Sequence, residues 1–101
     1  MGYGRFEVRV LEAAQKYIDG LSEMEQGAIR ADMDAMKLGN FDSVHTKRLK
    51  DKIRELIVGR HRISYFRIGS TLYFVRGFRK KSAKTPKQEI EYAGQVYRLM
   101  K

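Results

Sequence analysis

Two runs of β-branched and aromatic residues, joined at Gly69-Ser70, constrain the fold more than any other feature of the chain. They form the segment "HRISYFRIGSTLYFVRGF", which occupies residues 61–78. A short polar connection that contains glycine, placed between two such runs, is typical of a β-hairpin. We therefore expect two antiparallel strands here. If the pleat is regular, Arg62 and His61 lie on opposite faces of the first of them.

Two further segments have the pattern of strands. In "RFEVRVL", residues 5–11, apolar residues alternate with charged ones, which is the period of a strand with one buried face. In "LKDKIRELIVG", residues 49–59, cationic residues alternate with other side chains before the segment becomes apolar. The preceding loop, "GNFDSVHTK", is polar. The sequence thus predicts about four strands.

Three segments have helical spacing of apolar residues. The first begins at Glu12, and Gly20 offers a left-handed stop. Ser22 and Glu25 form a capping-box pattern that opens the second helix, which Gly39 closes. For the last helix we expect Thr85 as the N-cap with Pro86 in the first turn.

The resulting order is β-α-α-β-β-β-α in a single domain over residues 1–101. This order separates helices from an antiparallel meander, which indicates an α+β fold with an antiparallel sheet of about four strands. The N-terminal helices should pack on one face of that sheet, with a C-terminal helix following the last strand. The other face would be left for function.

Charge is concentrated in one part of the chain. The net charge is +9, but residues 45–87 hold 14 Lys and Arg residues with only Asp51 and Glu55, whereas residues 1–44 have more acids than bases. A positive field of this kind attracts polyanions. An excess confined to the middle of the chain indicates a binding surface and not a general solubility device.

The cationic residues come from three segments that should be neighbouring strands, and could converge on a phosphate. This set consists of Lys50, Lys52, Arg54, Arg60, Arg62, Arg76, Arg79, Lys80 and Lys81, with Lys84 in the loop that follows. Arginine binds phosphate with two parallel hydrogen bonds. The interleaved aromatic residues could stack on bases, and the residues in question are Tyr65, Phe66, Tyr73 and Phe78. The alternative is a solvated basic face over core aromatics.

RNA cleavage without a metal needs a base, cations around the phosphorus and an acid for the leaving oxygen. Lys80 or Lys81, crowded by other cations, could act as base or acid. Histidine is a common general acid or base, so His61 is a further candidate, although an exposed turn histidine is the simpler interpretation. His45 lies in the polar loop, where a plain surface role is the simpler interpretation.

Several chemistries have no support in the sequence. The chain has no cysteine, two separated histidines and few acids in its basic half, so we expect no metal site and no cofactor. Phosphate-loop, dinucleotide-binding and serine-hydrolase motifs are absent. No apolar run approaches the length of a membrane-spanning helix, and the N-terminus has no signal-peptide core, so we expect a cytoplasmic protein that does not bind membranes.

The segment from Leu49 to Ala93 resembles the HigB-like, phage-protein-like branch of the RelE/ParE toxin superfamily. In that branch a strand ending in "E-L" precedes a "yRi.Y" strand, a strand closing in "gF.KK" and a helix opening with "tP..Ei..A". The matching residues are Glu55-Leu56, Arg62-Ile63 with Tyr65, Gly77-Phe78 with Lys80-Lys81, and Thr85-Pro86 with Glu89-Ile90 and Ala93.

The resemblance implies a ribonuclease-like fold and a toxin of a type II toxin-antitoxin system that cleaves mRNA on the ribosome. It also implies a cognate antitoxin, often a helix-turn-helix protein, that blocks the basic face. By motif position Arg62, Lys80 and Lys81 would hold the scissile phosphate, with Arg54 and Arg79 flanking them. Relatives have arginine where this chain has Ile57 and histidine where it has Arg76. Some use tyrosine or histidine near the last helix, where Tyr92 is the candidate here.

Two alternatives stay open at this point. One is a ParE-like inhibitor of DNA gyrase built on the same fold, and the other is a nucleic-acid-binding module without catalysis. Loss of message would indicate the mRNA-cleaving toxin, and DNA damage would indicate the gyrase inhibitor. Salt-sensitive binding without cleavage would indicate the non-catalytic module.

Overall fold

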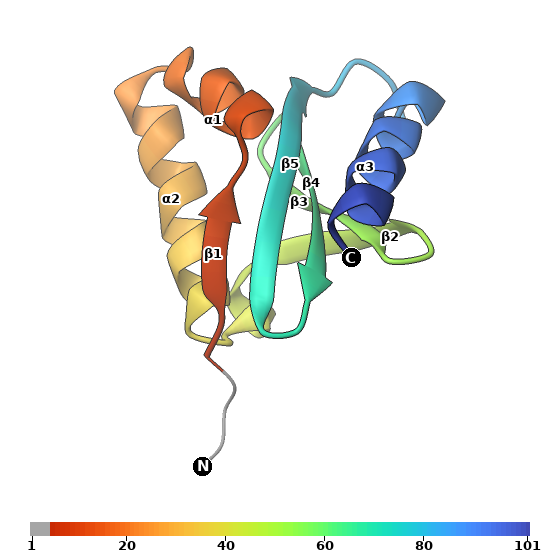
Figure 1. The fold of residues 1–101 in the computed structure, drawn as a ribbon. Coiled ribbons are helices and arrows are strands. Elements are labelled where there is room, and N and C mark those ends of the chain that lie inside the picture. The colour runs from red at the N-terminus through yellow and green to blue at the C-terminus, as the bar shows by residue number, and fades with distance from the viewer. Residues whose placement is uncertain (1–4) are drawn as a thin grey trace.

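The protein is an α+β fold of three helices and a five-stranded sheet (Figure 1). The computed structural model describes residues 5–101, so the first four residues of the expected domain lie outside that range. The elements are β1 (Glu7–Val10), α1 (Glu12–Asp19), α2 (Glu23–Lys37), the 3₁₀ turn η1 (Phe41–Ser43), β2 (His45–Lys50), β3 (Ile53–Val58), β4 (His61–Ile68), β5 (Thr71–Arg79) and α3 (Lys87–Met100).

The sheet has the strand order β1-β5-β4-β3-β2. Strands β2 to β5 form an antiparallel meander, and the β4–β5 hairpin is confirmed, with Gly69 at a φ of 61° in its turn. The predicted α+β class is confirmed, and the sheet differs from the expected antiparallel sheet of about four strands in two details. Strand β1 pairs in parallel with β5 (Glu7 opposite Thr71), and β2 is an additional strand.

The additional strand lies where a loop was expected. Strand β2 begins at His45, and a turn at Asp51 and Lys52 separates it from β3. Asp51 adopts a φ of 53°, a left-handed conformation that a short polar side chain tolerates. Because β2 is an edge strand with mostly exposed side chains, it lacks the apolar alternation that marks a half-buried strand. The single strand expected over residues 49–59 is therefore two.

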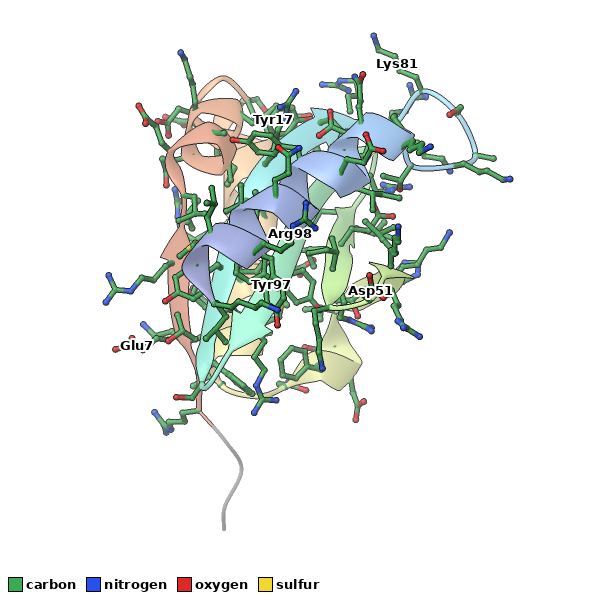
Figure 2. All side chains as sticks on the ribbon, turned by 45° about the vertical axis from the view of Figure 1, so that its right-hand side comes forward. Glu7, Tyr17, Asp51, Lys81, Tyr97 and Arg98 are labelled. Atoms are coloured by element: carbon green, nitrogen blue, oxygen red, sulfur yellow. The ribbon has the colours of Figure 1, made fainter. Side chains whose placement is uncertain are left out.

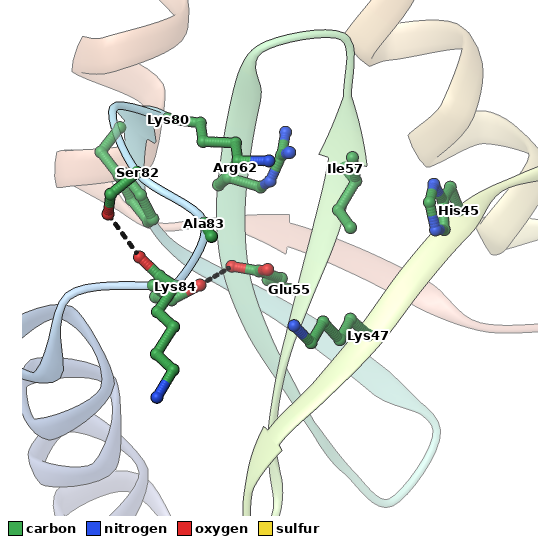
Figure 3. A pocket seen from close by; sticks show the side chains of 11 residues that line it. His45, Lys47, Glu55, Ile57, Arg62, Lys80, Ser82, Ala83 and Lys84 are labelled. Atoms are coloured by element: carbon green, nitrogen blue, oxygen red, sulfur yellow. Dashed lines mark hydrogen bonds between the residues drawn. The ribbon is translucent and has the colours of Figure 1, made fainter.

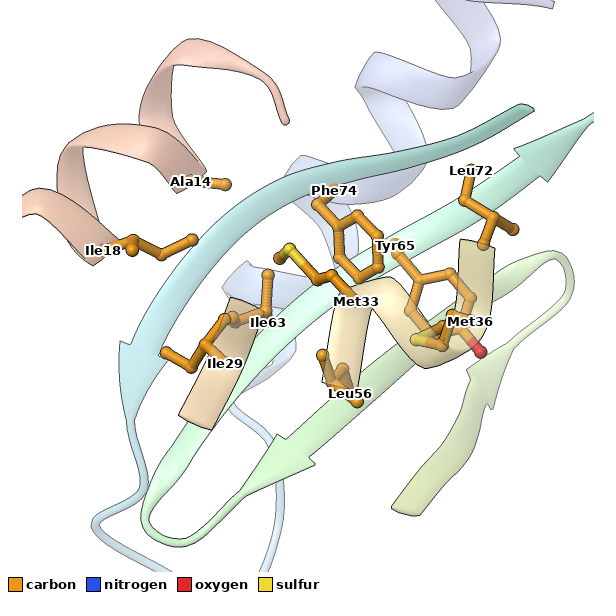
Figure 4. Close-up of a cluster of buried hydrophobic side chains, with 10 residues drawn as sticks. All are labelled: Ala14, Ile18, Ile29, Met33, Met36, Leu56, Ile63, Tyr65, Leu72 and Phe74. Atoms are coloured by element: carbon orange, nitrogen blue, oxygen red, sulfur yellow. The ribbon is translucent and has the colours of Figure 1, made fainter. Parts of the chain in front are cut away.

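Helices cover both faces of the sheet. Helices α1 and α2 pack on one face over a core that includes Ile29, Met36, Leu56 and Phe74 (Figure 4). Helix α3 packs on the other face, where Ala93 meets a smaller core that includes Phe66 and Val75. The expectation that one face is free of helices is therefore wrong for the part beneath α3. No helix within residues 5–101 is long and apolar enough to span a bilayer.

The helix ends follow the expected chemistry in part. The Ser22–Glu25 capping box is present, and Gly39 follows α2 with a φ of 80°. Gly20 ends α1 in a right-handed conformation with a φ of −83°, so the left-handed stop predicted there is wrong. The N-cap of α3 is Pro86, and Thr85 is not a cap because its hydroxyl donates to Glu55 Oε1 at 2.8 Å.

A β-bulge in β5 decides which side chains reach which face. Ser64 pairs with Arg76 and Tyr65 pairs with Phe74, so Val75 is an extra residue on β5. The Ser64 hydroxyl donates to the Arg76 carbonyl at 3.2 Å. Val75 packs in the core beneath α3, and Arg76 also turns toward α3, where it approaches Glu89. A bulge shifts the alternation by one position, so Phe78 and Lys80 follow Arg76 onto the α3 face.

Candidate nucleic-acid interface

A cavity of about 280 Å³ opens on the α3 face of the sheet, beyond the N-terminal end of that helix (Figure 3). It is formed by strands β2 to β5 and by the loop between β5 and α3. We call it the phosphate pocket, and its lining consists of His45, Lys47, Glu55, Ile57, Arg62, Phe78, Lys80, Ser82, Ala83, Lys84 and Thr85.

The strand register brings the floor of the phosphate pocket together. Arg62 on β4 lies directly between Ile57 on β3 and Phe78 on β5. Glu55 lies two residues along β3 from Ile57, so it is a diagonal neighbour of Arg62, at a Cα separation of about 7–8 Å. Three strands thus deliver a guanidinium, a carboxylate and an aromatic ring to one surface.

The loop after β5 forms the wall of the phosphate pocket. The Lys80 amide donates to the Arg60 carbonyl at 2.8 Å, which holds the start of the loop against the β3–β4 turn. The Ser82 hydroxyl donates to the Lys84 carbonyl at 3.0 Å, and Thr85 reaches the Glu55 carboxylate. These contacts place Lys80 beside Arg62, whereas the Lys84 side chain extends away from Arg62 (Figure 3).

The lining of the phosphate pocket is strongly cationic. It contains Lys47, Arg62, Lys80 and Lys84 against one carboxylate, Glu55, which is only 2% exposed. The Arg62 Nη1 group donates to the carbonyls of Gly59 (2.8 Å) and His61 (3.1 Å). Both bonds use the same nitrogen, which leaves Nε and Nη2 to donate to a phosphodiester.

The structure separates the four residues predicted to be catalytic. Arg62 and Lys80 line the phosphate pocket together, as does Lys84. Lys81 is exposed on the loop outside the pocket lining, and Figure 2 shows its side chain extending away from the body of the protein. Arg79 lies on the opposite face, where its Nη2 is 3.7 Å from Glu25 Oε2 on α2. A shared site for Arg79 and Lys80 is therefore wrong, because adjacent residues in a strand point to opposite faces.

The remaining predicted RNA contacts do not form one continuous basic face. Lys50 lines a second cavity between α3 and the β2–β3 turn, and Lys52 and Arg54 line another toward the β4–β5 turn. Arg54 is engaged with Tyr65 Oη and Thr46 Oγ1, both at 3.2 Å. Arg60 is exposed at the β3–β4 turn.

Arg76 is bound to α3. Its Nε lies 3.3 Å from Glu89 Oε1, and its guanidinium stacks 4.7 Å from the centre of the Tyr92 ring. The Arg76 side chain therefore pins α3 to β5 and lies outside the phosphate pocket. Tyr92, the acid or base candidate that the resemblance suggested, covers this guanidinium.

His61 is buried and not the exposed turn residue that was considered. It is 4% exposed, and its side chain lies on the α1–α2 face, opposite Arg62 as the alternation predicted. Its Nδ1 is 2.6 Å from Tyr17 Oη and its Nε2 is 2.8 Å from Glu25 Oε2. We call these three residues the Tyr17–His61–Glu25 chain. With Nε2 donating to the carboxylate, Nδ1 of a neutral ring accepts from the Tyr17 hydroxyl.

Two residues of this chain, Glu25 and Tyr17, have shifted pKa values. The hydrogen bond from His61, followed by those from Ser22, lowers the pKa of Glu25 from 4.5 to about 2. Burial is the main cause that raises the pKa of Tyr17, with Arg79 opposing the shift. Both shifts favour, at neutral pH, an ionised Glu25 and a protonated Tyr17, which are the states that the hydrogen bonds of the Tyr17–His61–Glu25 chain require.

Sequence reasoning did not assign several residues of the phosphate pocket to the site, among them His45, Lys47, Glu55 and Thr85. The sequence does indicate the position of Glu55, because in a regular strand it points to the same face as Ile53 and Ile57 on β3. Of the aromatic residues proposed to stack on bases, Tyr65 and Phe66 are core residues and Tyr73 packs against Phe66. Phe78 does reach the pocket. Residues 5–101 contain no cluster of three or more potential metal ligands.

The chain belongs to the family described as "Phage derived protein Gp49-like (DUF891)", which matches residues 16–98. This match agrees with the resemblance to a phage-protein-like branch that the motifs indicated. No curated protein has a matching sequence.

The fold is that of RelE proteins. The archaeal RelE-RelB complex from Pyrococcus horikoshii OT3 matches with a TM-score of 0.68 at 10% identity, over 77% of this chain and 98% of that one. The RelB-RelE antitoxin-toxin complex from Methanococcus jannaschii gives 0.62 at 12% identity, over 92% and 99%. RelBE2 (Rv2865-2866), the toxin-antitoxin complex from Mycobacterium tuberculosis, gives 0.54 at 18% identity, over 80% and 98%.

Proposed function

We propose that the protein is the toxin of a type II toxin-antitoxin system and that it cleaves mRNA on the ribosome without a metal ion. The observation that carries this proposal is the convergence of Arg62 and Lys80 with Glu55 in one open pocket, whose lining also includes Lys84. The similarity of the fold to RelE chains from toxin-antitoxin complexes supports a toxin.

The reaction fits the residues of the phosphate pocket. The ribose 2′-oxygen attacks the adjacent phosphorus as its proton leaves, the bond from phosphorus to the 5′-oxygen breaks, and that oxygen takes up a proton. The products are a 2′,3′-cyclic phosphate and a 5′-hydroxyl. Arg62 would bind the non-bridging oxygens, and Lys80 would stabilise the charge that develops on them. Lys81 and Lys84 would hold the flanking phosphates.

Glu55 is the best-placed proton acceptor for the 2′-hydroxyl. It supplies the one carboxylate of the pocket lining, and the Thr85 hydroxyl fixes one of its oxygens at 2.8 Å. A carboxylate oriented in this way, beside an arginine that we propose binds phosphate, would take the 2′-hydroxyl proton as general base. Lys80 is the candidate acid for the leaving oxygen.

The test is in vitro translation with purified protein, with cleavage mapped on the message by primer extension. We expect cleavage that needs ribosomes and persists in EDTA at concentrations that leave the ribosomes intact. Arg62→Gln and Lys80→Gln should each reduce the cleavage rate about 10²–10³-fold, as loss of a charge-stabilising donor does. Arg30→Gln on α2 removes the same charge from another surface and should cleave like the wild type.

Intact message in the presence of folded wild-type protein and ribosomes would refute the proposal. Broken DNA with intact message, after expression in cells, would instead support the gyrase inhibitor. We further propose a cognate antitoxin, a small helix-turn-helix protein encoded next to this gene, that covers the phosphate pocket. Co-expression of that neighbour should abolish cleavage and yield a stable complex on size-exclusion chromatography.

A further inference from the structure

We propose that the cavity between α3 and the β2–β3 turn binds the nucleotides that adjoin the scissile phosphate, so that the RNA strand continues along α3. This inference rests on the proposed function and names a second part of the same substrate site. We call this cavity the α3 groove, and its lining consists of Lys50, Asp51, Ile53, Thr85, Lys87, Ile90, Glu91, Gly94, Gln95 and Arg98.

The α3 groove is continuous with the phosphate pocket. Thr85 belongs to the lining of both cavities. On β3, Glu55 lines the pocket and Ile53, the preceding residue on the same face, lines the groove at a spacing of about 7 Å. On β2, Lys47 lines the phosphate pocket and Lys50 lines the α3 groove. A strand held at Arg62 and Lys80 therefore reaches the groove without leaving the surface.

The chemistry of the α3 groove suits nucleotides. Its volume is about 590 Å³, within the range of roughly 300–1,000 Å³ that is typical of small-molecule sites. Ile90, which is half-buried, supplies an apolar surface for a base next to the buried Ile53, and the Gln95 amide can both donate and accept at a base edge. Lys50 and Arg98 are exposed cations on opposite sides, one on β2 and the other in the last turn of α3.

The cations of the groove lining outnumber its carboxylates. Glu91 is 4.0 Å from Lys87, an exposed pair one helical turn apart, and Asp51 is the remaining acid beside Lys50 and Arg98, so a small positive excess is left for phosphate. Figure 2 shows Arg98 on α3 with Asp51 across from it at the β2–β3 turn. A Cβ at Gly94 would lie 3.5 Å from Arg98 Nη1, an ordinary van der Waals contact, so a methyl group fits at this position of the groove.

The experiment compares RNA lengths. Fully 2′-O-methylated RNAs of four and twelve nucleotides cannot be cleaved, and their binding is measured by fluorescence anisotropy over a series of salt concentrations. We expect the double variant Lys50→Gln/Arg98→Gln to weaken binding of the longer RNA and to lower its salt slope by about 1.4, from two single-strand phosphate contacts at about 0.7 each. Binding of the shorter RNA should stay unchanged.

Two controls keep the test specific. Lys16→Gln/Arg30→Gln removes two charges from α1 and α2 and should leave the salt slope for both RNAs within about 0.3 of the wild type. Gly94→Glu places an anion in the α3 groove and should weaken binding of the longer RNA, whereas Gly94→Ala, which only adds a methyl group, should not.

The outcomes separate this inference from the proposed function. Equal effects of Lys50→Gln/Arg98→Gln on both lengths, or no effect on either, would overturn the α3 groove as a binding site. Loss of antitoxin binding with RNA binding intact would overturn it as well. In each of these cases the proposed function still stands if Arg62→Gln weakens binding of both RNAs. If Arg62→Gln changes neither, the proposed function fails.

Discussion

Gly77 is the position where the smallest substitution should have a large effect. It lies on the α1–α2 face of β5, against the ring of Tyr17. A Cβ at Gly77 would lie 2.8 Å from Tyr17 Cγ and closer still to Cδ2, and real Cβ atoms essentially never approach so near. Gly77→Ala must therefore displace the Tyr17 ring, and with it the hydroxyl that lies 2.6 Å from His61 Nδ1.

The expected cost has two parts. Forcing a methyl group into a packed contact costs about 1–3 kcal/mol. Loss of the hydrogen bond to His61 adds about 0.5–1.5 kcal/mol. Together they predict a loss of roughly 2–4 kcal/mol, a large part of the 5–15 kcal/mol that is typical of a domain. For a chain of this size, the melting temperature should fall by at least about 8 °C.

The assay is urea unfolding followed by circular dichroism, with two reference variants. Gly27→Ala on α2 adds the same methyl group where no atom lies within 4 Å, so it should stabilise by about 0.5–1 kcal/mol. Tyr17→Phe removes only the hydroxyl and should cost less than Gly77→Ala. If Gly77→Ala unfolds at the wild-type urea concentration, or if its structure retains Tyr17 in place, the reasoning is wrong.

Two further predictions concern charged contacts. The pKa of Glu25 is lowered to about 2, so its contribution to stability is present above pH 4.5 and is lost as the pH falls through about 2. In wild-type protein the urea concentration at the unfolding midpoint should therefore fall as the solution is acidified. Glu25→Gln should make this fall smaller, whereas Glu23→Gln should leave it unchanged. Arg76→Leu leaves the buried Glu89 carboxylate unpaired and should cost about 1–3 kcal/mol in urea unfolding at pH 7. Arg76→Lys keeps the charge and should cost less; wild-type stability in both variants would contradict the role of the pair.

The parts of the fold that follow from local chemistry could be predicted from the sequence. The β4–β5 hairpin, the capping box at Ser22 and the apolar stripe of α3 depend on residues close together in the chain. Motif resemblance added the superfamily. Strand β2 could not be predicted because it is an exposed edge strand, whose side chains carry no burial pattern.

The composition of the phosphate pocket depends on features that periodicity does not reveal. The bulge at Val75 changes the alternation in the middle of β5, so it turns Arg79 to the helices and Lys80 to the pocket. His61 is buried because Tyr17 and Glu25 reach it from α1 and α2, far away in the sequence. From the sequence, the Thr85 hydroxyl could cap helix α3 or donate a hydrogen bond to a carboxylate. The packing of the strands brings Glu55 within reach, so the hydroxyl bonds to Glu55.

The pairing of β1 with β5 makes completion of the sheet depend on residues that are synthesised late. Glu7 is among the first residues of the described chain to be made, yet its neighbour Thr71 follows 64 positions later. At about 5–20 residues per second, the nascent polypeptide waits several seconds for that strand and for the lysines beyond it. The sheet that carries Arg62 therefore cannot be completed until most of the chain has been synthesised.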